Sequence, residues 1–262
     1  MACHRNATPS GEVGHLRRRS TWSVYRTSEF QPPDFQSTVS RLHKEVQRST
    51  VVSYIYSRCS MTDRSNGYEG VAAEFLANRG NAPTRSRGIG VKPVREWART
   101  LMRGATVLDL GCGAGFPITD VLVTEGLNVY AIDASPSFVE AFRRNLPGIP
   151  VACEAVEDST FFDRTFDAVL SWGLMFLLPA EEQRRLIQRI GDILVPGGRQ
   201  LFTSPDEAVV WNDAMTGLES RSLGAVEYRN QLMAAGLLVT REYLDEGGYY
   251  FEASKTATAR PA

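Results

Sequence analysis

The chain has 262 residues, 43% of them hydrophobic and 23% charged, a composition that suits one large globular core. Its formal net charge of −1 argues against the strongly basic surface of many nucleic-acid-binding proteins. No apolar run reaches the roughly 20 residues that a membrane helix needs, so we expect a soluble protein without a membrane partner.

The N-terminal region differs from the rest in composition. Its first 28 residues hold five arginines, several serines and threonines, and a single acid, Glu12. An organelle transit peptide has this bias, and so does a disordered tail, which we favour. The four cysteines form no CxxC pair, which favours a reducing compartment. We therefore expect a cytoplasmic protein with an N-terminal extension over residues 1–60.

Hydrophobic spacing predicts the elements that follow. Apolar residues at helical intervals predict helices near 68–76 and 91–101, and strands alternate with helices from residue 105. We expect residues 205–222 to be irregular. The remaining expected strands are 105–110, 127–132, 149–153, 166–171, 199–204, 237–244 and 249–254, and the remaining expected helices are 116–125, 136–145, 180–194 and 224–235.

This alternation predicts an α/β fold with a parallel sheet and helices on both faces. The last two strands flank Asp245-Glu246-Gly247-Gly248, which is typical of a hairpin turn and adds one antiparallel strand. We expect one domain over residues 61–256, followed by a tail at 257–262.

A glycine-dense turn follows the first strand. Residues 107–115 read VLDLGCGAG, so the glycines are spaced G-x-G-x-G and lead into a helix. Two ligand classes compete for such a turn. A dinucleotide site spaces its glycines G-x-G-x-x-G, but Phe116 stands where its third glycine would be. Asp109 would also place negative charge beside a pyrophosphate, whereas the cationic cofactor S-adenosylmethionine tolerates that acid.

A second acid supports a nucleoside ligand. Asp133 lies 22 residues after Gly111, at the end of the second predicted strand. A carboxylate at that place can accept hydrogen bonds from both ribose hydroxyls, which either ligand class requires.

Residues 107–115, Asp133 and the Pro-Gly-Gly of residues 196–198 together resemble the motif set of the class I S-adenosylmethionine-dependent methyltransferases. The resemblance extends over residues 67–254. It implies a Rossmann-like seven-stranded mixed sheet of order 3-2-1-4-5-7-6, with strand 7 antiparallel, and S-adenosylmethionine as the cofactor.

The resemblance also implies roles for individual residues. Gly111 and Gly113 would line the methionine portion, Asp133 would bind the ribose, and Glu157 would contact the adenine. In the first predicted helix, a tyrosine would cap the cofactor and an arginine would pair with its carboxylate. The complete set of cofactor residues implied is Tyr68, Arg79, Asp109, Gly111, Cys112, Gly113, Asp133, Ala134, Val156, Glu157 and Ser171.

Methyl transfer from a sulfonium needs alignment and exclusion of water more than acid–base help. All three histidines, His4, His15 and His43, precede the predicted sheet, so a histidine base is not expected. The catalytic residues stay unassigned, with Tyr228, Asp206 and Tyr249 as candidate bases. An acceptor amine, thiol or carboxylate that is already nucleophilic would suit the absence of a base.

Aromatic residues concentrate after the fourth predicted strand and in residues 205–229. We expect Trp172, Phe176, Trp211 and Tyr228 to line a pocket for a small-molecule substrate. The sequence lacks a proline–cysteine dipeptide and a [DNS]-P-P-[YFW] motif, which disfavours methylation of nucleic-acid bases. Cys112 and Cys153 are interpreted as small buried hydrophobic residues, and the scattered acids predict no metal site.

The favoured function is transfer of a methyl group from S-adenosylmethionine to a small molecule. Three alternatives stay open from the sequence: a cofactor-binding module without catalysis, a nicotinamide oxidoreductase, and a methyltransferase acting on protein or RNA. The sequence does not indicate the acceptor atom or the oligomeric state.

Overall fold

The computed structural model describes residues 63–79 and 88–256. The predicted extension over 1–60 and the tail at 257–262 lie outside them, so those boundaries stay predictions. The backbone of Arg79 is described as the last residue of a helix, but its side chain lies outside the described part.

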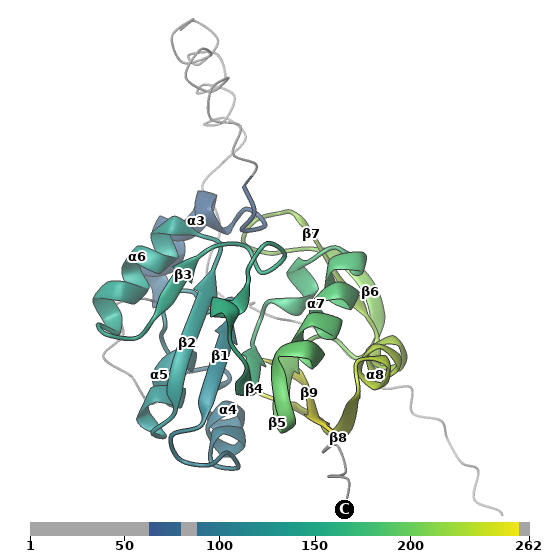
Figure 1. The fold of residues 1–262 in the computed structure, drawn as a ribbon. Helices are drawn as coiled ribbons and strands as arrows, with labels where there is room; N and C mark the ends of the chain where they lie inside the picture. The colour runs from purple at the N-terminus through teal and green to yellow at the C-terminus, as the bar shows by residue number, and fades with distance from the viewer. Residues whose placement is uncertain (1–62, 80–87, 257–262) are drawn as a thin grey trace, which may run out of the picture. The chain divides into compact units, whose positions relative to one another are not determined.

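A seven-stranded mixed sheet forms the centre of the molecule (Figure 1). Its strand order is β3-β2-β1-β4-β5-β9-β8, in which β9 is antiparallel to both of its neighbours. If β8 and β9 are counted as the sixth and seventh strands of this sheet, the order is the expected 3-2-1-4-5-7-6. The strands are β1 (Thr106–Leu110), β2 (Asn128–Asp133), β3 (Val151–Cys153), β4 (Phe166–Ser171), β5 (Leu194–Thr203), β8 (Leu237–Asp245) and β9 (Gly248–Lys255).

Helices cover both faces of this sheet, as predicted. Helices α4 and α5 pack on one face, where they share a buried cluster with Val107, Val129 and Leu170. Helices α7 and α8 pack on the opposite face. The helices are α3 (Tyr68–Arg79), α4 (Val91–Ala98), α5 (Ile118–Thr124), α6 (Pro136–Asn145), α7 (Ala180–Ile193) and α8 (Ala225–Ala234), with short 3-10 turns η1 (Phe161–Asp163) and η2 (Met175–Leu177).

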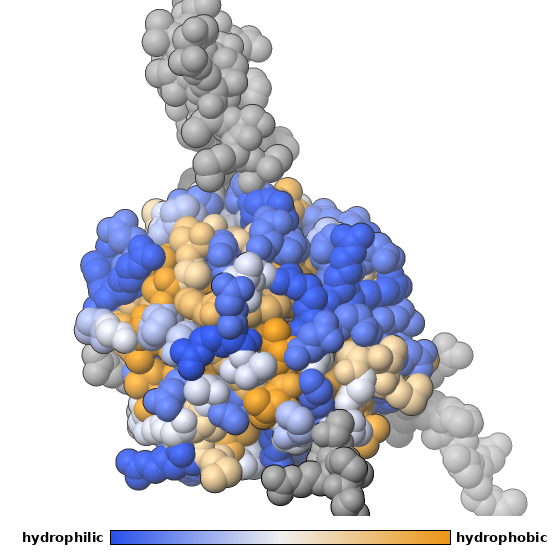
Figure 2. All heavy atoms as spheres, in the orientation of Figure 1, coloured by the Kyte–Doolittle hydropathy of each residue, from blue (hydrophilic) through white to orange (hydrophobic). Residues whose placement is uncertain are grey.

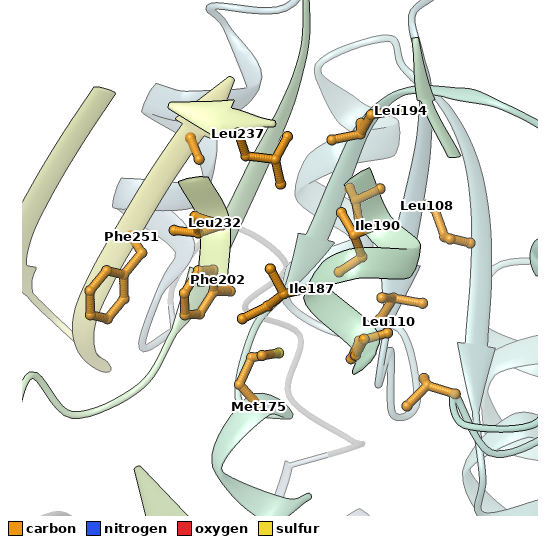
Figure 3. Close-up of a cluster of buried hydrophobic side chains, with 14 of the residues drawn as sticks. Leu108, Leu110, Met175, Ile187, Ile190, Leu194, Phe202, Leu232, Leu237 and Phe251 are labelled. Carbon is orange, nitrogen blue, oxygen red and sulfur yellow. The ribbon is translucent and has the colours of Figure 1, made fainter. Parts of the chain in front are cut away.

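The larger part of the core lies between the sheet and helices α7 and α8 (Figure 3). Ile187 and Ile190 of α7 and Leu232 of α8 are fully buried against the sheet. Phe202 of β5 stacks on Phe251 of β9, with ring centroids 4.8 Å apart. The two strands are therefore joined by packing as well as by their ladder of hydrogen bonds.

Local chemistry explains where the helix after β2 begins. The Ser135 hydroxyl accepts a hydrogen bond from the backbone N–H of Phe138 at 3.2 Å, and Pro136 occupies the first helical position. A serine cap followed by proline is a strong helix start. This places the N-terminus of α6 directly after Asp133, at the carboxyl edge of the sheet.

The prediction that residues 205–222 are irregular is wrong. They contain a hairpin of β6 (Ala208–Asn212) and β7 (Glu219–Leu223), which forms a separate two-stranded sheet. Alternation of apolar and polar residues does not reveal it, because β6 carries exposed Val209 and Val210 while β7 is largely polar. Instead, β7 lies against η2, α7 and α8.

Among the described residues, none of the helices is both long enough and apolar enough to span a bilayer. The outward faces of α6 and α7 are predominantly hydrophilic, as Figure 2 shows. These two helices expose charged residues that include Arg143, Arg144, Glu181 and Arg185.

Candidate functional site

The glycine turn joins β1 to α5 at the carboxyl edge of the sheet. Gly111, Gly113 and Gly115 have φ values of 72°, 55° and 85°, a left-handed region that favours glycine. A Cβ on Gly115 would lie 2.7 Å from the Leu146 side chain, so this glycine lets α6 approach the turn. A Cβ on Gly113 would meet no atom within 4 Å. Gly113 thus borders open space into which a ligand can fit.

Asp133 ends β2 beside this open space. Its Oδ2 accepts a hydrogen bond from the N–H of Gly113, and its Oδ1 accepts one from the N–H of Ser135, both at 2.8 Å. A carboxylate oxygen has two acceptor positions, so both oxygens keep one for a further donor. Burial raises the pKa of Asp133 to about 6, against the opposing effect of these two hydrogen bonds. The carboxylate is oriented in advance and can accept two hydroxyl groups.

A second carboxyl group lies beneath the turn. Asp109 is 1% exposed and accepts a hydrogen bond from the Thr119 hydroxyl at 2.6 Å. Burial raises its pKa to about 7, the Thr119 hydrogen bond opposes that shift, and the charge of Asp133 adds to it. Asp109 faces α5 within the protein, so it contributes charge to the site but no surface.

Helix α3 is tied to the N-terminus of α6. The carboxylate of Glu69 accepts hydrogen bonds from the Ser135 and Ser137 hydroxyls and from the backbone N–H of Ser137. Burial alone would raise the pKa of Glu69, but these hydrogen bonds outweigh it and the pKa is lowered. Phe75 of α3 packs on Phe138 of α6, with ring centroids 5.1 Å apart.

Tyr68 extends this attachment to the β6–β7 hairpin. Its hydroxyl donates to Oδ2 of Asp213 at 3.2 Å. A Cβ on the preceding Gly67 would lie 3.0 Å from the Leu218 side chain, which shows how closely the hairpin loop approaches α3. Tyr68, the first residue of α3, therefore links this helix to the hairpin. Its ring lies beside the aromatic pair of Phe75 and Phe138.

The loop after β3 continues the edge beyond Asp133. The N–H of Glu154 donates to the carbonyl of Asp133 at 3.0 Å, so this loop adjoins the end of β2. Glu157 forms an ion pair with Arg64 at 3.5 Å. Val156 is 4% exposed and packs in the core, so it can offer only backbone groups. Ala134 is partly buried between Asp133 and the cap of α6.

Two further predicted cofactor residues are buried. Ser171, the last residue of β4, is fully buried, and its hydroxyl has no hydrogen-bond partner among the described residues. Cys112 is 9% exposed and belongs to a small cluster with Ala131, Phe142 and Leu146. It is a small buried residue, as expected, whereas the same expectation for Cys153 is wrong because that residue is exposed.

The predicted substrate residues do not form one wall. Phe176 of η2 and Trp211 of β6 come together, with ring centroids 5.6 Å apart. Trp172 instead packs on the α4 side of the sheet, where its indole N–H donates to the Tyr250 hydroxyl at 3.0 Å. A Cβ on Gly90, which precedes α4, would lie 2.5 Å from that indole nitrogen. Trp172 is thus a packing residue between α4 and β9.

Tyr228 is enclosed in the core. It is fully buried, and its hydroxyl donates to the Gln183 side-chain carbonyl at 2.6 Å and lies 2.8 Å from the Ser204 hydroxyl. Burial raises its pKa. A tyrosine in this position cannot contact a substrate or accept its proton. The geometry suits neither of its predicted roles, as a catalytic base or as a pocket residue.

The other two candidate bases lie apart from the glycine turn. The Tyr249 hydroxyl donates to Glu242 at 3.0 Å, and Glu242 also pairs with Arg229 of α8. Asp206 is exposed in the connection between β5 and β6. Among the described residues, neither Tyr249 nor Asp206 contacts the glycine turn. Within the described ranges, no three histidine, cysteine or acidic side chains are grouped closely enough to hold a metal ion.

Several residues of the site escape sequence reasoning. Glu69 and Arg64 act through contacts with loops that are distant in sequence. Leu174 covers Gly111, since a Cβ there would lie 3.0 Å from the leucine Cβ. None of these three residues belongs to a recognisable sequence motif. The only sign of their role in the sequence is that they lie within a few residues of Tyr68 or of the end of β4.

Residues 107–198 match a family model described as a methyltransferase domain. An uncharacterized methyltransferase of Mycobacterium tuberculosis is 33% identical over 110 residues, which are 40% of this chain and 42% of that protein. The cypemycin N-terminal methyltransferase of a Streptomyces species is 36% identical over 108 residues, 40% of this chain and 44% of that protein. These matches span less than half the length of either relative.

Solved structures extend the similarity of fold. The CcbJ methyltransferase from Streptomyces caelestis superposes with a TM-score of 0.58 and 15% sequence identity, over 75% of this chain and 99% of that one. The fold is therefore shared over a longer stretch of the chain than the recognisable sequence similarity.

Proposed function

We propose that this chain is a class I S-adenosylmethionine-dependent methyltransferase and that it transfers the methyl group of that cofactor to a small-molecule acceptor. The observation behind the choice of acceptor is the contact between α3 and the hairpin loop. Tyr68 of α3 reaches Asp213 of the hairpin loop, and Gly67 lies against Leu218. An edge bridged in this way favours an acceptor small enough to pass beneath the bridge.

The residues of the glycine turn fit the cofactor. Gly113 borders open space that a side chain would fill, and both oxygens of Asp133 can accept one more hydrogen bond. We assign the methionine portion to Gly111 and Gly113 and the ribose hydroxyls to Asp133. The nearby carboxyl groups of Asp109 and Glu69 disfavour a pyrophosphate and favour a ligand with a sulfonium charge.

When bound, S-adenosylmethionine supplies a methyl group that is already activated for displacement. The protein's part is then to align the acceptor with that methyl group and to exclude water. Leu174, which covers Gly111, and the turn η2 that follows it form the apolar side of this space.

We place the acceptor beside Phe176 and Trp211. Two aromatic rings 5.6 Å apart form a surface that attracts a flat or cationic group. All three histidines precede residue 44, so a conventional histidine base would have to come from outside the described region. An amine that reaches the site unprotonated needs little help from a base, and the similarity to an N-terminal methyltransferase supports this class first.

The experiment is a transfer assay with S-adenosylmethionine labelled in its methyl group. The purified chain is incubated with this cofactor and a cell extract divided into small-molecule and macromolecular fractions. We expect label, and a mass gain of one methylene, in a small molecule. Heat-treated protein is the control.

Label confined to protein or RNA would contradict the small-molecule acceptor and favour the macromolecular alternative. Tight cofactor binding without label in any fraction would favour a binding module. A titration that responds to NAD but not to S-adenosylmethionine would overturn the proposed cofactor chemistry itself.

A further inference from the structure

We infer that Arg189 of α7 is a positioning residue, which fixes the loop that holds the base of the cofactor. The inference rests on the proposed function, because it assumes that an adenine-bearing ligand lies along the carboxyl edge. It concerns a residue that lies outside the glycine turn and has no place in the motifs of the sequence.

Arg189 is bonded to three carbonyl groups of one loop. Its Nη1 donates to the carbonyls of Val156 at 2.7 Å and Glu157 at 3.1 Å, and its Nη2 donates to the carbonyl of Ser159. The guanidinium carbon lies 4.2 Å from the ring centroid of Phe161. A planar guanidinium that always carries its charge is suited to hold several carbonyls at once.

The loop held in this way adjoins the site. Strands β1, β2 and β3 are consecutive neighbours in the sheet, and the loop follows β3. Asp133 lies beside Cys153 in the β2–β3 register, and its carbonyl accepts the N–H of Glu154. A nucleoside that starts at Gly113 and passes Asp133 therefore meets this loop next.

The contacts of Arg189 constrain the groups that would recognise a base. A trans peptide is planar, so holding the carbonyl of Val156 also fixes the N–H of Glu157 on the opposite side. Arg64 restrains the same loop through the Glu157 and Asp158 side chains, at 3.5 and 3.1 Å. Arg64 is nearly half exposed, so screening by solvent weakens its ion pairs. Arg189 is the stronger restraint.

The test uses two ligands that differ only in the base. S-adenosylhomocysteine carries a 6-amino group, and S-inosylhomocysteine carries an oxygen there. Binding of both to the full chain is measured by calorimetry for the natural protein, Arg189→Met and Arg189→Lys. Arg185→Met is the matched control, because Arg185 lies on the same helix, is largely exposed and, within the described ranges, pairs with Glu182 alone.

We expect Arg189→Met to bind S-adenosylhomocysteine about tenfold more weakly, as when a group that orients a ligand-binding residue is removed. It should also lose most of the preference for the amino base. Arg189→Lys should retain part of the affinity and part of the base preference, because one ammonium group can hold fewer carbonyls than a guanidinium. Arg185→Met should change neither the affinity nor the base preference.

An unchanged preference between the two ligands in Arg189→Met would overturn the inference, even if both bound more weakly. If Arg189→Met does not fold, Arg189→Lys provides the test. If Arg189→Lys binds S-adenosylhomocysteine as tightly as the natural chain does, with the same preference for the amino base, the inference is wrong. Failure of the natural chain to bind either ligand would instead contradict the proposed function.

Discussion

At the scale of single residues, the site is notable for two neighbouring carboxyl groups, one on the buried Asp109 and one on the partly buried Asp133. Asp109 and Asp133 both have raised pKa values, about 7 and about 6, and burial is the main cause for each. The ordinary pKa of an aspartate carboxyl lies well below neutral pH, so an unperturbed aspartate is ionised at pH 7. The unliganded site therefore holds acids that ionise with difficulty, and a cation placed beside them would make ionisation easier.

The raised pKa of Asp109 predicts a pH dependence of stability. Above about pH 4 this carboxyl ionises readily in the unfolded chain but not in the folded one, so stability falls as the pH rises towards 7. Between pH 5 and 7.5 the loss should be on the order of 2 kcal/mol, at about 1.4 kcal/mol per pKa unit. Urea denaturation at both pH values measures it.

Asp109→Asn keeps an acceptor for Thr119 but cannot ionise, so its stability should differ less between the two pH values. Glu242, whose pKa is lowered by its hydrogen bond with Arg229, contributes the opposite dependence only below its ordinary value of 4.5. A pH dependence in Asp109→Asn as steep as in the natural chain would contradict this origin.

At the scale of elements, the turn η1 has an unusual backbone. Phe161, Phe162 and Asp163 have φ values of 53°, 59° and 51°, three consecutive non-glycine residues in the left-handed region. Each such residue costs roughly 1–2 kcal/mol relative to a right-handed conformation. The turn is held by the Ser159 hydroxyl, which accepts from the N–H of Phe161 at 2.8 Å, and by Arg189 over the Phe161 ring.

Replacing Asp163 with glycine should stabilise the fold. Asp163 is exposed, so its side chain contributes little packing. Glycine adopts the left-handed region without strain, although it also gains freedom in the unfolded chain. We expect a net gain of about 0.5–1 kcal/mol in the free energy of unfolding. Asp163→Ala should lose stability, and a glycine variant less stable than the alanine variant would refute the account.

Element by element, the sheet could be predicted because its strands have simple sequence signals. β1 is buried over Val107, Leu108 and Leu110, and the helix after β2 begins with the Ser-Pro signal of residues 135 and 136. The hairpin and the turn η1 could not be predicted. Exposed Val210 of β6 breaks the apolar–polar alternation, and the left-handed turn uses no glycine.

The same limit applies to the site. The left-handed glycine turn after β1 and the position of Asp133 at the end of β2 could be predicted, because the glycine spacing and the strand pattern mark them in the sequence. Their contact with a cofactor stays a prediction. Tyr228 could not be separated from a pocket residue, since its burial depends on Gln183 and Ser204 from other elements. Trp172 faces α4 for a comparable reason, because Gly90 leaves room for its indole ring.

At the scale of the whole described region, residues 63–69 connect three loops that are far apart in sequence. Arg64 pairs with the loop after β3, Glu69 binds Ser135 and Ser137 after β2, and Tyr68 reaches the hairpin loop. All three loops lie at the carboxyl edge, where the cofactor is proposed to bind. This segment should therefore slow release of the cofactor.

Glu69→Ala removes the contacts with Ser135 and Ser137 and should speed cofactor dissociation roughly three- to tenfold, the effect of about one net hydrogen bond. Stopped-flow measurement of S-adenosylmethionine release gives this rate. Glu74→Ala is the control, because Glu74 is exposed on the same helix. Equal dissociation rates in the two variants would argue against a restraining role for this segment.

In the proposed arrangement, S-adenosylmethionine lies along the glycine turn with its ribose on Asp133. Calorimetric titration of the natural chain and of Asp133→Ala with this cofactor tests it most directly. We predict saturable binding to the natural chain and a loss of about 1–3 kcal/mol in the variant, the cost of leaving polar groups unpaired. Equal affinity in the two proteins, or no binding to the natural chain, would contradict the claim.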